Sequence, residues 1–210
     1  MQPLIMKHFT TIRKLFFEYG IRSISMDDIA HRLHISKRTI YKEYTSKDEL
    51  VKDLFLSDYY QLKASLNSLD SKKMDAITKT MRMYSMTQRS ITSISALVLD
   101  DLEEYYPALL DELVVLYKEL IHLSFVGILS QGKADRYFHN EIMPDSIALL
   151  FSFLFESYAL SRISVSTDGF TLGWNDVLDY HFRSICNPIG LDKWATIMKL
   201  NLKSEDDGQT

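Results

Sequence analysis

A chain of 210 residues with 46% hydrophobic and 25% charged residues can bury a substantial core, and its 7 Gly and 4 Pro disfavour a turn-rich β architecture. Its single cysteine, Cys186, excludes an intramolecular disulfide and a multi-cysteine metal site. We expect a small core residue there, with a redox switch as the alternative. The net charge of −4 is divided unevenly, because residues 1–50 hold nine Lys/Arg against six Asp/Glu and the remainder is acidic.

The first predicted element is an amphipathic helix over residues 5–19. Its apolar residues recur at steps of three and four, and it is followed by Gly20, which can end a helix in a left-handed conformation. Ser25 then predicts an N-cap, with Asp28 at the third helical position as in a capping box. The sequence therefore predicts a second, short helix that ends near residue 33.

Two more helix starts follow closely. Ser36 predicts the N-cap of another short helix, which runs to about Tyr44, and Ser46–Glu49 is a capping box that opens a long helix. One capping box is common by chance. Three helix starts within about 22 residues, framing two very short helices, are much rarer.

Longer helices are predicted for the rest of the chain. Pro107 and Pro144 suit first helical positions, and Gly132 is expected to end the helix that Pro107 begins. The predicted helices are 72–88 with Ser71 as cap, 90–105, 107–132, 144–163 and 173–188, before a polar tail over 204–210 that we expect to be disordered. The fold class is therefore all-α.

The segment Met26–Tyr44 has the pattern of a helix-turn-helix. Two helices that cross steeply need a small residue at the crossing, here Ala30, and a small apolar core, here Ile29, Leu33, Ile35 and Ile40. The second helix carries polar and basic side chains that could enter a DNA groove: Lys37, Arg38, Thr39, Tyr41 and Lys42. Basic residues at a helix start oppose the macrodipole, and a phosphate contact would offset that cost. The alternative is that these side chains are simply solvated.

These motifs resemble the N-terminal domain of the TetR/AcrR family of transcriptional regulators. The resemblance covers about residues 5–52 and rests on Leu15-Phe16, Gly20, Ser25–Ala30, Ile35–Tyr41, Tyr44 and Ser46–Leu50. It implies a three-helix, helix-turn-helix domain that binds double-stranded DNA, and a C-terminal helical domain that binds a small-molecule effector and forms a homodimer. It further implies DNA contacts from Ser25, Lys37, Arg38, Thr39, Tyr41, Lys42 and Lys47.

Two positions depart from the family pattern. His34 stands where the family usually has Gly, and it can adopt the left-handed conformation of the turn at a cost of about 1 kcal/mol. Tyr44 stands where the family usually has Phe, so we expect its hydroxyl at an exposed edge. The expected domains are 1–46 for DNA binding and 47–203 for effector binding and dimerisation.

Residues 147–160 are apolar nearly all round, so a helix there must be covered on both sides. A second subunit is the simplest cover, and the helix from residue 173 would complete the interface; a core helix in a monomer is the alternative. The expected interface residues are Phe153, Tyr158, Trp174, Leu178 and Phe182. Glu156 either pairs with a basic residue at the rim or faces a ligand cavity.

Aromatic and Met side chains of the C-terminal domain are candidates for an effector pocket, because they leave adaptable cavities. The candidates are Tyr84, Met86, Tyr106, Tyr117, His122, Phe125, Phe151 and Phe155, each of which also suits an ordinary core position. We expect an apolar or aromatic effector, no cofactor and no metal.

An enzyme is the main rival class. The sequence has no Gly-rich phosphate loop, no His-x-x-x-His zinc pair and no nucleophile elbow. A protein-interaction module with the same fold is the second rival, which the basic run from Lys37 to Lys42 disfavours. No signal peptide is visible, and the most apolar stretch, 147–160, is shorter than the about 20 residues that a bilayer requires. We therefore expect a cytoplasmic protein.

Overall fold

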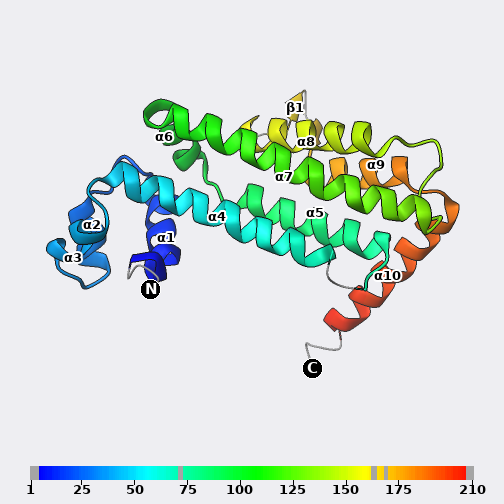
Figure 1. The fold of residues 1–210 in the computed structure, drawn as a ribbon, viewed down its shortest axis with the longest axis horizontal. Helices are drawn as coiled ribbons and strands as arrows, with labels where there is room; N and C mark the ends of the chain where they lie inside the picture. Colours follow the sequence, from blue (N-terminus) through cyan, green and yellow to red (C-terminus); the bar gives the residue numbers. More distant parts are fainter. Residues whose placement is uncertain (1–4, 71–72, 162–164, 168–169, 207–210) are drawn as a thin grey trace. The chain divides into compact units, whose positions relative to one another are not determined.

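The computed structural model of the protein describes residues 5–70, 73–161, 165–167 and 170–206 (Figure 1). The elements are the short 3-10 helix η1 (Ile5–His8) and the α-helices α1 (Phe9–Tyr19), α2 (Met26–Arg32), α3 (Lys37–Glu43), α4 (Lys47–Asp70), α5 (Ala76–Thr92), α6 (Ala96–Tyr105), α7 (Pro107–Ala134), α8 (Pro144–Ser161), α9 (Trp174–Ile185) and α10 (Pro188–Asp206). A hairpin pairs β1 (Val165–Thr167) with β2 (Phe170–Leu172) in antiparallel register. The expected helical fold is confirmed, with this hairpin as a small addition.

The chain divides into two compact units. Unit 1 comprises residues 1–64 and 90–117, and unit 2 comprises residues 65–89 and 118–210, so that α4, α5 and α7 each contribute to both. The boundary expected near residue 46 is a functional one, between a DNA-binding segment and the rest, and it stays a prediction.

The core of unit 1 joins the N-terminal helices to α4, α6 and the start of α7. The inner face of α1 buries Phe9, Ile12, Leu15 and Phe16, as the spacing of its apolar residues predicts. These side chains belong to one cluster with Ile29, Ile40, Leu50, Leu54, Leu102 and Leu109. Because α2 and α3 have only 7 residues each, they are too short to be stable alone and depend on this shared core.

The predicted helix starts around the turn are confirmed. Ser25 Oγ accepts a hydrogen bond from the Asp28 N–H at 3.1 Å, and the Asp28 carboxylate accepts one from the Ser25 N–H at 2.8 Å, which completes the capping box. Ser36 Oγ accepts a hydrogen bond from the Thr39 N–H at 3.1 Å. Gly20 ends α1 with a φ of 79°.

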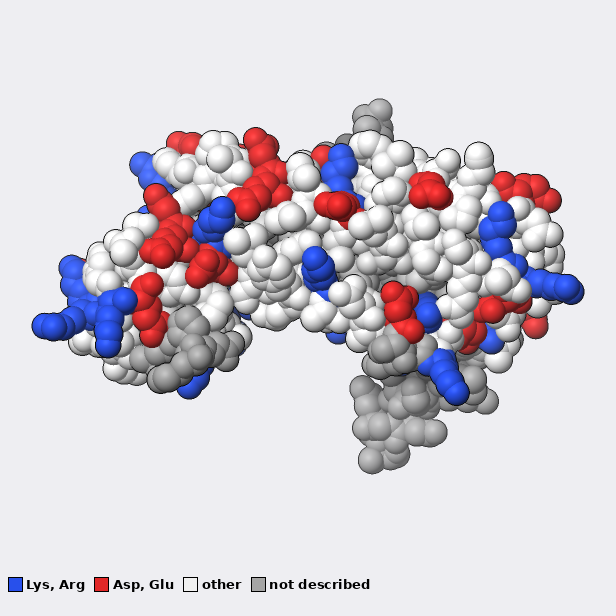
Figure 2. All heavy atoms as spheres, in the orientation of Figure 1, with Lys and Arg blue, Asp and Glu red and all other residues white. Residues whose placement is uncertain are grey.

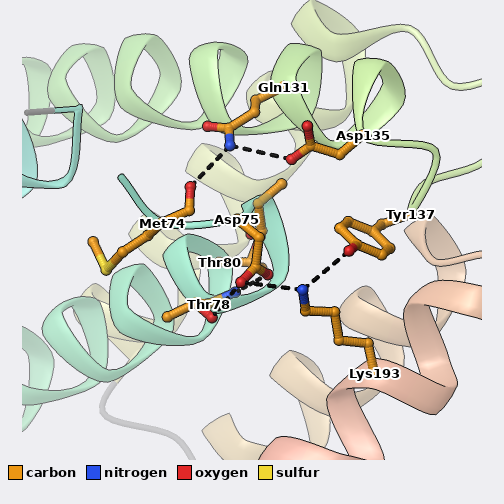
Figure 3. A network of polar contacts seen from close by, with 9 residues as sticks. Met74, Asp75, Thr78, Thr80, Gln131, Asp135, Tyr137 and Lys193 are labelled. Atoms are coloured by element: carbon orange, nitrogen blue, oxygen red, sulfur yellow. Dashed lines mark hydrogen bonds and ion pairs between the residues drawn. The ribbon is translucent and has the colours of Figure 1, made fainter. Parts of the chain in front are cut away.

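In unit 2, polar contacts tie α10 to the other helices. Figure 3 shows Lys193 of α10 pointing toward Asp75 at the start of α5 and toward Tyr137 in the segment after α7. Lys193 Nζ lies 3.3 Å from the Asp75 carboxylate and donates to the Tyr137 hydroxyl at 3.0 Å. Asp75 also accepts from the N–H of Thr78 at 3.1 Å, so one carboxylate both caps α5 and anchors α10.

Three predicted helix boundaries before residue 107 were wrong. The helix predicted over 72–88 begins at Ala76, capped by Asp75, whereas the expected cap, Ser71, lies outside the described residues. It continues to Thr92, and α6 starts only after a separate N-cap, Ser95, whose Oγ accepts from the Val98 N–H at 3.3 Å.

Gly132 does not end α7, which runs on to Ala134. A Cβ at Gly132 would overlap the ring of Phe138, which is buried, so the glycine allows that ring to approach the helix closely. The chain leaves the helix through Arg136, which has a φ of 59°.

Pro188 was expected to stop the helix before it, but α9 already ends at Ile185 and Pro188 begins α10. Asn187 caps this helix by accepting from the Gly190 N–H at 3.0 Å. Residues 204–206, expected in a disordered tail, are helical, and residues 207–210 lie outside the described residues.

Among the described residues, α7 is the helix whose length and apolar composition would allow it to cross a membrane. Length and composition alone are weak evidence, because the core helices of soluble proteins also satisfy them.

Candidate DNA-binding surface and ligand site

The turn between α2 and α3 requires a left-handed residue, and His34 supplies it with a φ of 55°. The Ile35 N–H then donates to the Ala30 carbonyl at 3.0 Å. Ala30 is 4% exposed, and Ile29 and Ile40 are fully buried, so the helices cross at a small residue as predicted. The cost of about 1 kcal/mol at His34 is offset by this packing.

The outer face of α3 presents most of the predicted DNA contacts. Lys37, Arg38, Tyr41 and Lys42 are exposed, whereas Thr39 is partly buried, with its hydroxyl 2.8 Å from Ser36 Oγ. The other three exposed residues follow Lys37 by one, four and five positions, so all four lie on one side of the short helix. This arrangement can enter a groove as a unit.

Lys and Arg side chains gather at the end of unit 1 formed by α2 and α3 (Figure 2). Lys37 Nζ forms an exposed ion pair with Asp27 at 2.7 Å, and this hydrogen bond raises the pKa of Lys37. Within the described parts of the chain, Arg38 and Lys42 have no ion pair. Their charges are therefore available to an anionic partner.

Lys47 stands in the first turn of α4, but its ammonium faces the protein. Lys47 Nζ donates to the carbonyl of Ile21 at 2.5 Å and to that of Arg22 at 3.4 Å. Burial lowers the pKa of Lys47, although nearby carboxylates favour its charge. Lys47 thus fastens the loop before α2 and keeps one N–H for a phosphate, a contact that stays a prediction.

The same loop is held from α6. Asp101 Oδ2 accepts from the Arg22 N–H at 2.8 Å, and the Arg22 guanidinium lies 4.9 Å from the centre of the Tyr105 ring. A Cβ at Gly20 would lie 2.7 Å from the same Asp101 oxygen. We refer to Asp101, Tyr105 and Lys47 around this loop as the loop clamp.

Two further predicted residues have structural roles. Ser25 is exposed, but its hydroxyl is engaged with Asp28 at 2.5 Å, and this hydrogen bond lowers the pKa of Asp28. Tyr44 is only 2% exposed, so the expectation that its hydroxyl lies at an exposed edge was wrong. Its ring completes the core beneath the turn, and burial, followed by the charge of nearby Asp53, raises the pKa of Tyr44.

In unit 2, helices α5, α7, α8 and α9 each contribute one ring to an aromatic cluster: Tyr84, Phe125, Phe151 and His181. Ring centroids lie 5.3 Å apart for Tyr84 and Phe151, 5.1 Å for Phe125 and Phe151, and 4.9 Å for Phe151 and His181. All four side chains are buried. Three were predicted pocket residues, whereas His181 was missed because a histidine in an amphipathic helix gives no distinct signal.

Tyr84 and His181 form a buried polar pair in this cluster, with the Tyr84 hydroxyl 2.5 Å from His181 Nδ1. Burial lowers the pKa of His181 to about 4 and raises the pKa of Tyr84 well above its ordinary value. Both side chains are therefore uncharged at neutral pH.

The other predicted pocket residues are dispersed. Tyr106 and Tyr117 pack against the core of unit 1, and Phe155 packs edge-on against Trp174 at 6.3 Å. Met86 is partly buried on α5, and His122 Nε2 lies 3.8 Å from the Asp145 carboxylate.

A hollow of about 530 Å³ opens elsewhere in unit 2, beside the start of α10. It is lined by Lys133, Ala134, Arg136, Phe138, His139, Asn140, Glu141, Asn187 and Ile189, none of which belongs to the predicted pocket. The predicted pocket therefore stays a hypothesis.

The apolar surface of unit 2 differs from the predicted dimer interface. Trp174, Leu178 and Phe182 are 4%, 7% and 2% exposed in the single chain, so they pack inward and offer no surface to a partner. Tyr158 is partly buried, and its hydroxyl accepts from the Trp174 N–H at 2.9 Å. The fifth predicted interface residue, Phe153, is 46% exposed, although Lys118 Nζ lies 4.3 Å from the centre of its ring. Leu149 and Leu150, also on α8, are 45% and 51% exposed.

Two open questions from the sequence are answered by contacts. Glu156 pairs with Lys118 at 2.7 Å, which agrees with a rim position. Cys186 is 1% exposed, and burial raises the pKa of its thiol to about 12, so it is a protonated core residue.

Comparison with solved structures shows the same fold in several transcriptional regulators. One from Cytophaga hutchinsonii is 13% identical, with 89% of this chain and 100% of that chain covered and a TM-score of 0.70. A TetR/AcrR-family regulator from Thermobifida fusca is 15% identical (85% and 93% covered, TM-score 0.59). A ketosteroid transcriptional regulator of Mycobacterium tuberculosis is 17% identical (87% and 94% covered, TM-score 0.54).

A family match covers the candidate DNA-binding surface directly. No match was found among curated protein sequences. Residues 6–54, from η1 into α4, match the family described as bacterial regulatory proteins, tetR family. This segment contains the capped α2, the His34 turn and the exposed face of α3. Over residues 6–54 the chain therefore matches the tetR family of bacterial regulatory proteins, and its described residues have the fold of the TetR/AcrR-family regulator from Thermobifida fusca.

Proposed function

We propose that this protein binds a near-palindromic operator in double-stranded DNA as a homodimer, represses transcription there, and is released by a small-molecule effector. The observation that supports DNA binding most strongly is the outer face of α3. Arg38, Tyr41 and Lys42 are exposed there, and neither cation has an ion pair in the described chain.

The dimensions of α3 suit the major groove. A helix of 7 residues is about 10 Å long, and the groove of B-form DNA is about 12 Å wide, so the exposed face can meet base edges over one short site. Lys37 would exchange its exposed ion pair with Asp27 for a phosphate or base contact. Thr39, being partly buried, is the least accessible of the five candidates.

The exposed apolar face of α8 supports a homodimer. Three large apolar side chains, Leu149, Leu150 and Phe153, are about half exposed, and a twofold contact between two copies would remove them from water. The interface would place two α3 helices on successive half-sites, which is why we propose a near-palindrome. The protein would act in the cytoplasm, where it meets DNA.

The test begins with selection of bound sequences from random duplex DNA, followed by affinity measurements on the selected sequence. Arg38→Ala and Lys42→Ala should each weaken binding by about 5- to 150-fold if they reach bases. Lys52→Ala is the matched control, because Lys52 is an exposed cation of unit 1 on α4, paired with Glu112 at 2.8 Å. Equal effects of the three substitutions, or no selected sequence, would favour a protein-interaction module with the same fold.

A further inference from the structure

Three buried nitrogen atoms of unit 2 have no hydrogen-bond partner in the part of the chain that the structure describes. They are Trp174 Nε1 and His181 Nε2 on α9, and His122 Nε2 on α7. Trp174 is 4% exposed and His181 is 6% exposed. Folded proteins seldom leave a buried N–H unpaired, because the group loses its hydrogen bonds to water and gains none in the protein, which costs free energy. Two such groups on one helix therefore indicate an occupant.

His181 offers a donor at Nε2. Its Nδ1 lies 2.5 Å from the Tyr84 hydroxyl. The phenol keeps its proton because burial raises the pKa of Tyr84, and the imidazole is neutral because burial lowers the pKa of His181. If Nδ1 carried the imidazole proton, the phenol hydrogen would have no acceptor among the described residues, so we assign the phenol as the donor to Nδ1 and the imidazole proton to Nε2. Trp174 Nε1 is a donor in any case.

The two donors lie on the same side of α9. Seven residues separate Trp174 from His181, which is about two helical turns, or about 10 Å along the axis. The ring of Phe151 lies near both, with its centroid 6.0 Å from that of Trp174 and 4.9 Å from that of His181. Phe125 and Tyr158 flank the two ends, at 5.5 Å from His181 and 5.0 Å from Trp174.

We propose that this cluster binds a flat, apolar, uncharged ring compound with a hydrogen-bond acceptor at each end. One acceptor would receive the Trp174 Nε1–H and the other the His181 Nε2–H, while the rings of Phe151 and Phe125 cover its faces. The surrounding side chains are neutral, so an anion would lack a counter-charge and a cation would face two donors. Uncharged oxygen acceptors suit the site.

The rings are in contact, so the compound has to separate α9 from α7 and α8 when it binds. A compound that binds one helix arrangement better than another shifts the population between them, which is the requirement for control of DNA binding. Only this role as effector rests on the proposed function. The binding site itself rests on the buried donors.

The probe for the test is 4,4′-diacetylbiphenyl, a flat compound with a carbonyl at each end, and its matched control is 4,4′-diethylbiphenyl, which has a similar shape without oxygen. Calorimetric titration of the full chain should show the diketone binding about tenfold more tightly than the hydrocarbon. Trp174→Phe should reduce this preference, and Tyr84→Phe combined with His181→Phe should reduce it as well. No binding of the diketone, equal binding of the two compounds, or a preference that survives both variants would overturn the proposal.

Stability without any compound gives a second readout. Tyr84→Phe combined with His181→Phe removes the unpaired donor together with the group paired to its ring and keeps both aromatic rings, so the free energy of unfolding should equal or exceed that of the wild type. A clear loss in this variant would show that His181 Nε2 is already paired, for example with buried water, and would overturn the proposal. Operator selection by the wild type without compounds tests DNA binding separately, so the two ideas can fail independently.

Discussion

Replacement of Gly20 by alanine should destabilise the protein by about 2–4 kcal/mol, because Gly20 occupies a backbone region that other residues avoid. With a φ of 79° and a ψ of 163°, an L side chain at Gly20 costs about 1–3 kcal/mol. The new Cβ would also lie 2.7 Å from Asp101 Oδ2. The carboxylate would have to move and weaken its 2.8 Å hydrogen bond from Arg22, a further cost of about 0.5–1.5 kcal/mol.

The assay is urea unfolding followed by circular dichroism, combined with operator affinity. Gly127→Ala is the matched control, because Gly127 lies inside α7 and a Cβ at that position would have no atom within 4 Å, so alanine there should stabilise the helix by about 0.5–1 kcal/mol. Adding Asp101→Ala to Gly20→Ala should restore the part of the loss that arises from the contact. A Gly20→Ala protein as stable as the wild type would refute the strain argument.

Three further substitutions test other parts of the structure. Phe153→Glu should yield monomers by light scattering, whereas Val115→Glu, on an exposed part of α7, should not; dimers in both would contradict an interface on α8. The pKa of His181 is lowered to about 4 from an ordinary 6.5, so the unfolded chain binds the extra proton between these values. The free energy of unfolding should therefore fall by about 3 kcal/mol as the pH decreases from 6.5 to 4. In urea titrations at several pH values, His181→Gln should make this decrease smaller; the same pH dependence in both proteins would contradict a buried, neutral His181. Gly132→Ala should lower the melting temperature, since its Cβ would meet the buried Phe138 ring at a cost of about 1–3 kcal/mol; an equal or higher value would contradict the close packing.

The helix-turn-helix could be predicted because its signals are local. Ser25 and Ser36 act on N–H groups three residues away, and the conformation of His34 is set by the short turn itself. Gly132 was misinterpreted because its role depends on the ring of Phe138, which packs on it after the chain has turned back. Pro188 was misinterpreted because a proline after a helix suits both a stop and a new start, and the Asn187 cap decides for a start.

The candidate sites were less predictable for the same reason. Asp101 lies in an acidic stretch that suggests a solvated helix end, and only tertiary packing brings it to the Arg22 loop. An aromatic pattern does not tell which face of a helix is inward, so Trp174 and Phe182 were assigned to a surface although they are buried. His181 gained its importance from Tyr84, which lies 97 residues earlier in the chain.

The most direct test of the central claim is the salt dependence of affinity for the selected operator, compared between the wild type and Lys42→Ala. Lys42 is an exposed cation of α3 with no ion pair in the described residues. If it meets a phosphate in each half-site, a dimer of the variant loses two contacts, and the slope of log affinity against log salt should become less steep by about 2. A slope equal to that of the wild type, together with unchanged affinity for Arg38→Ala, would contradict the assignment of α3 as the DNA-binding helix.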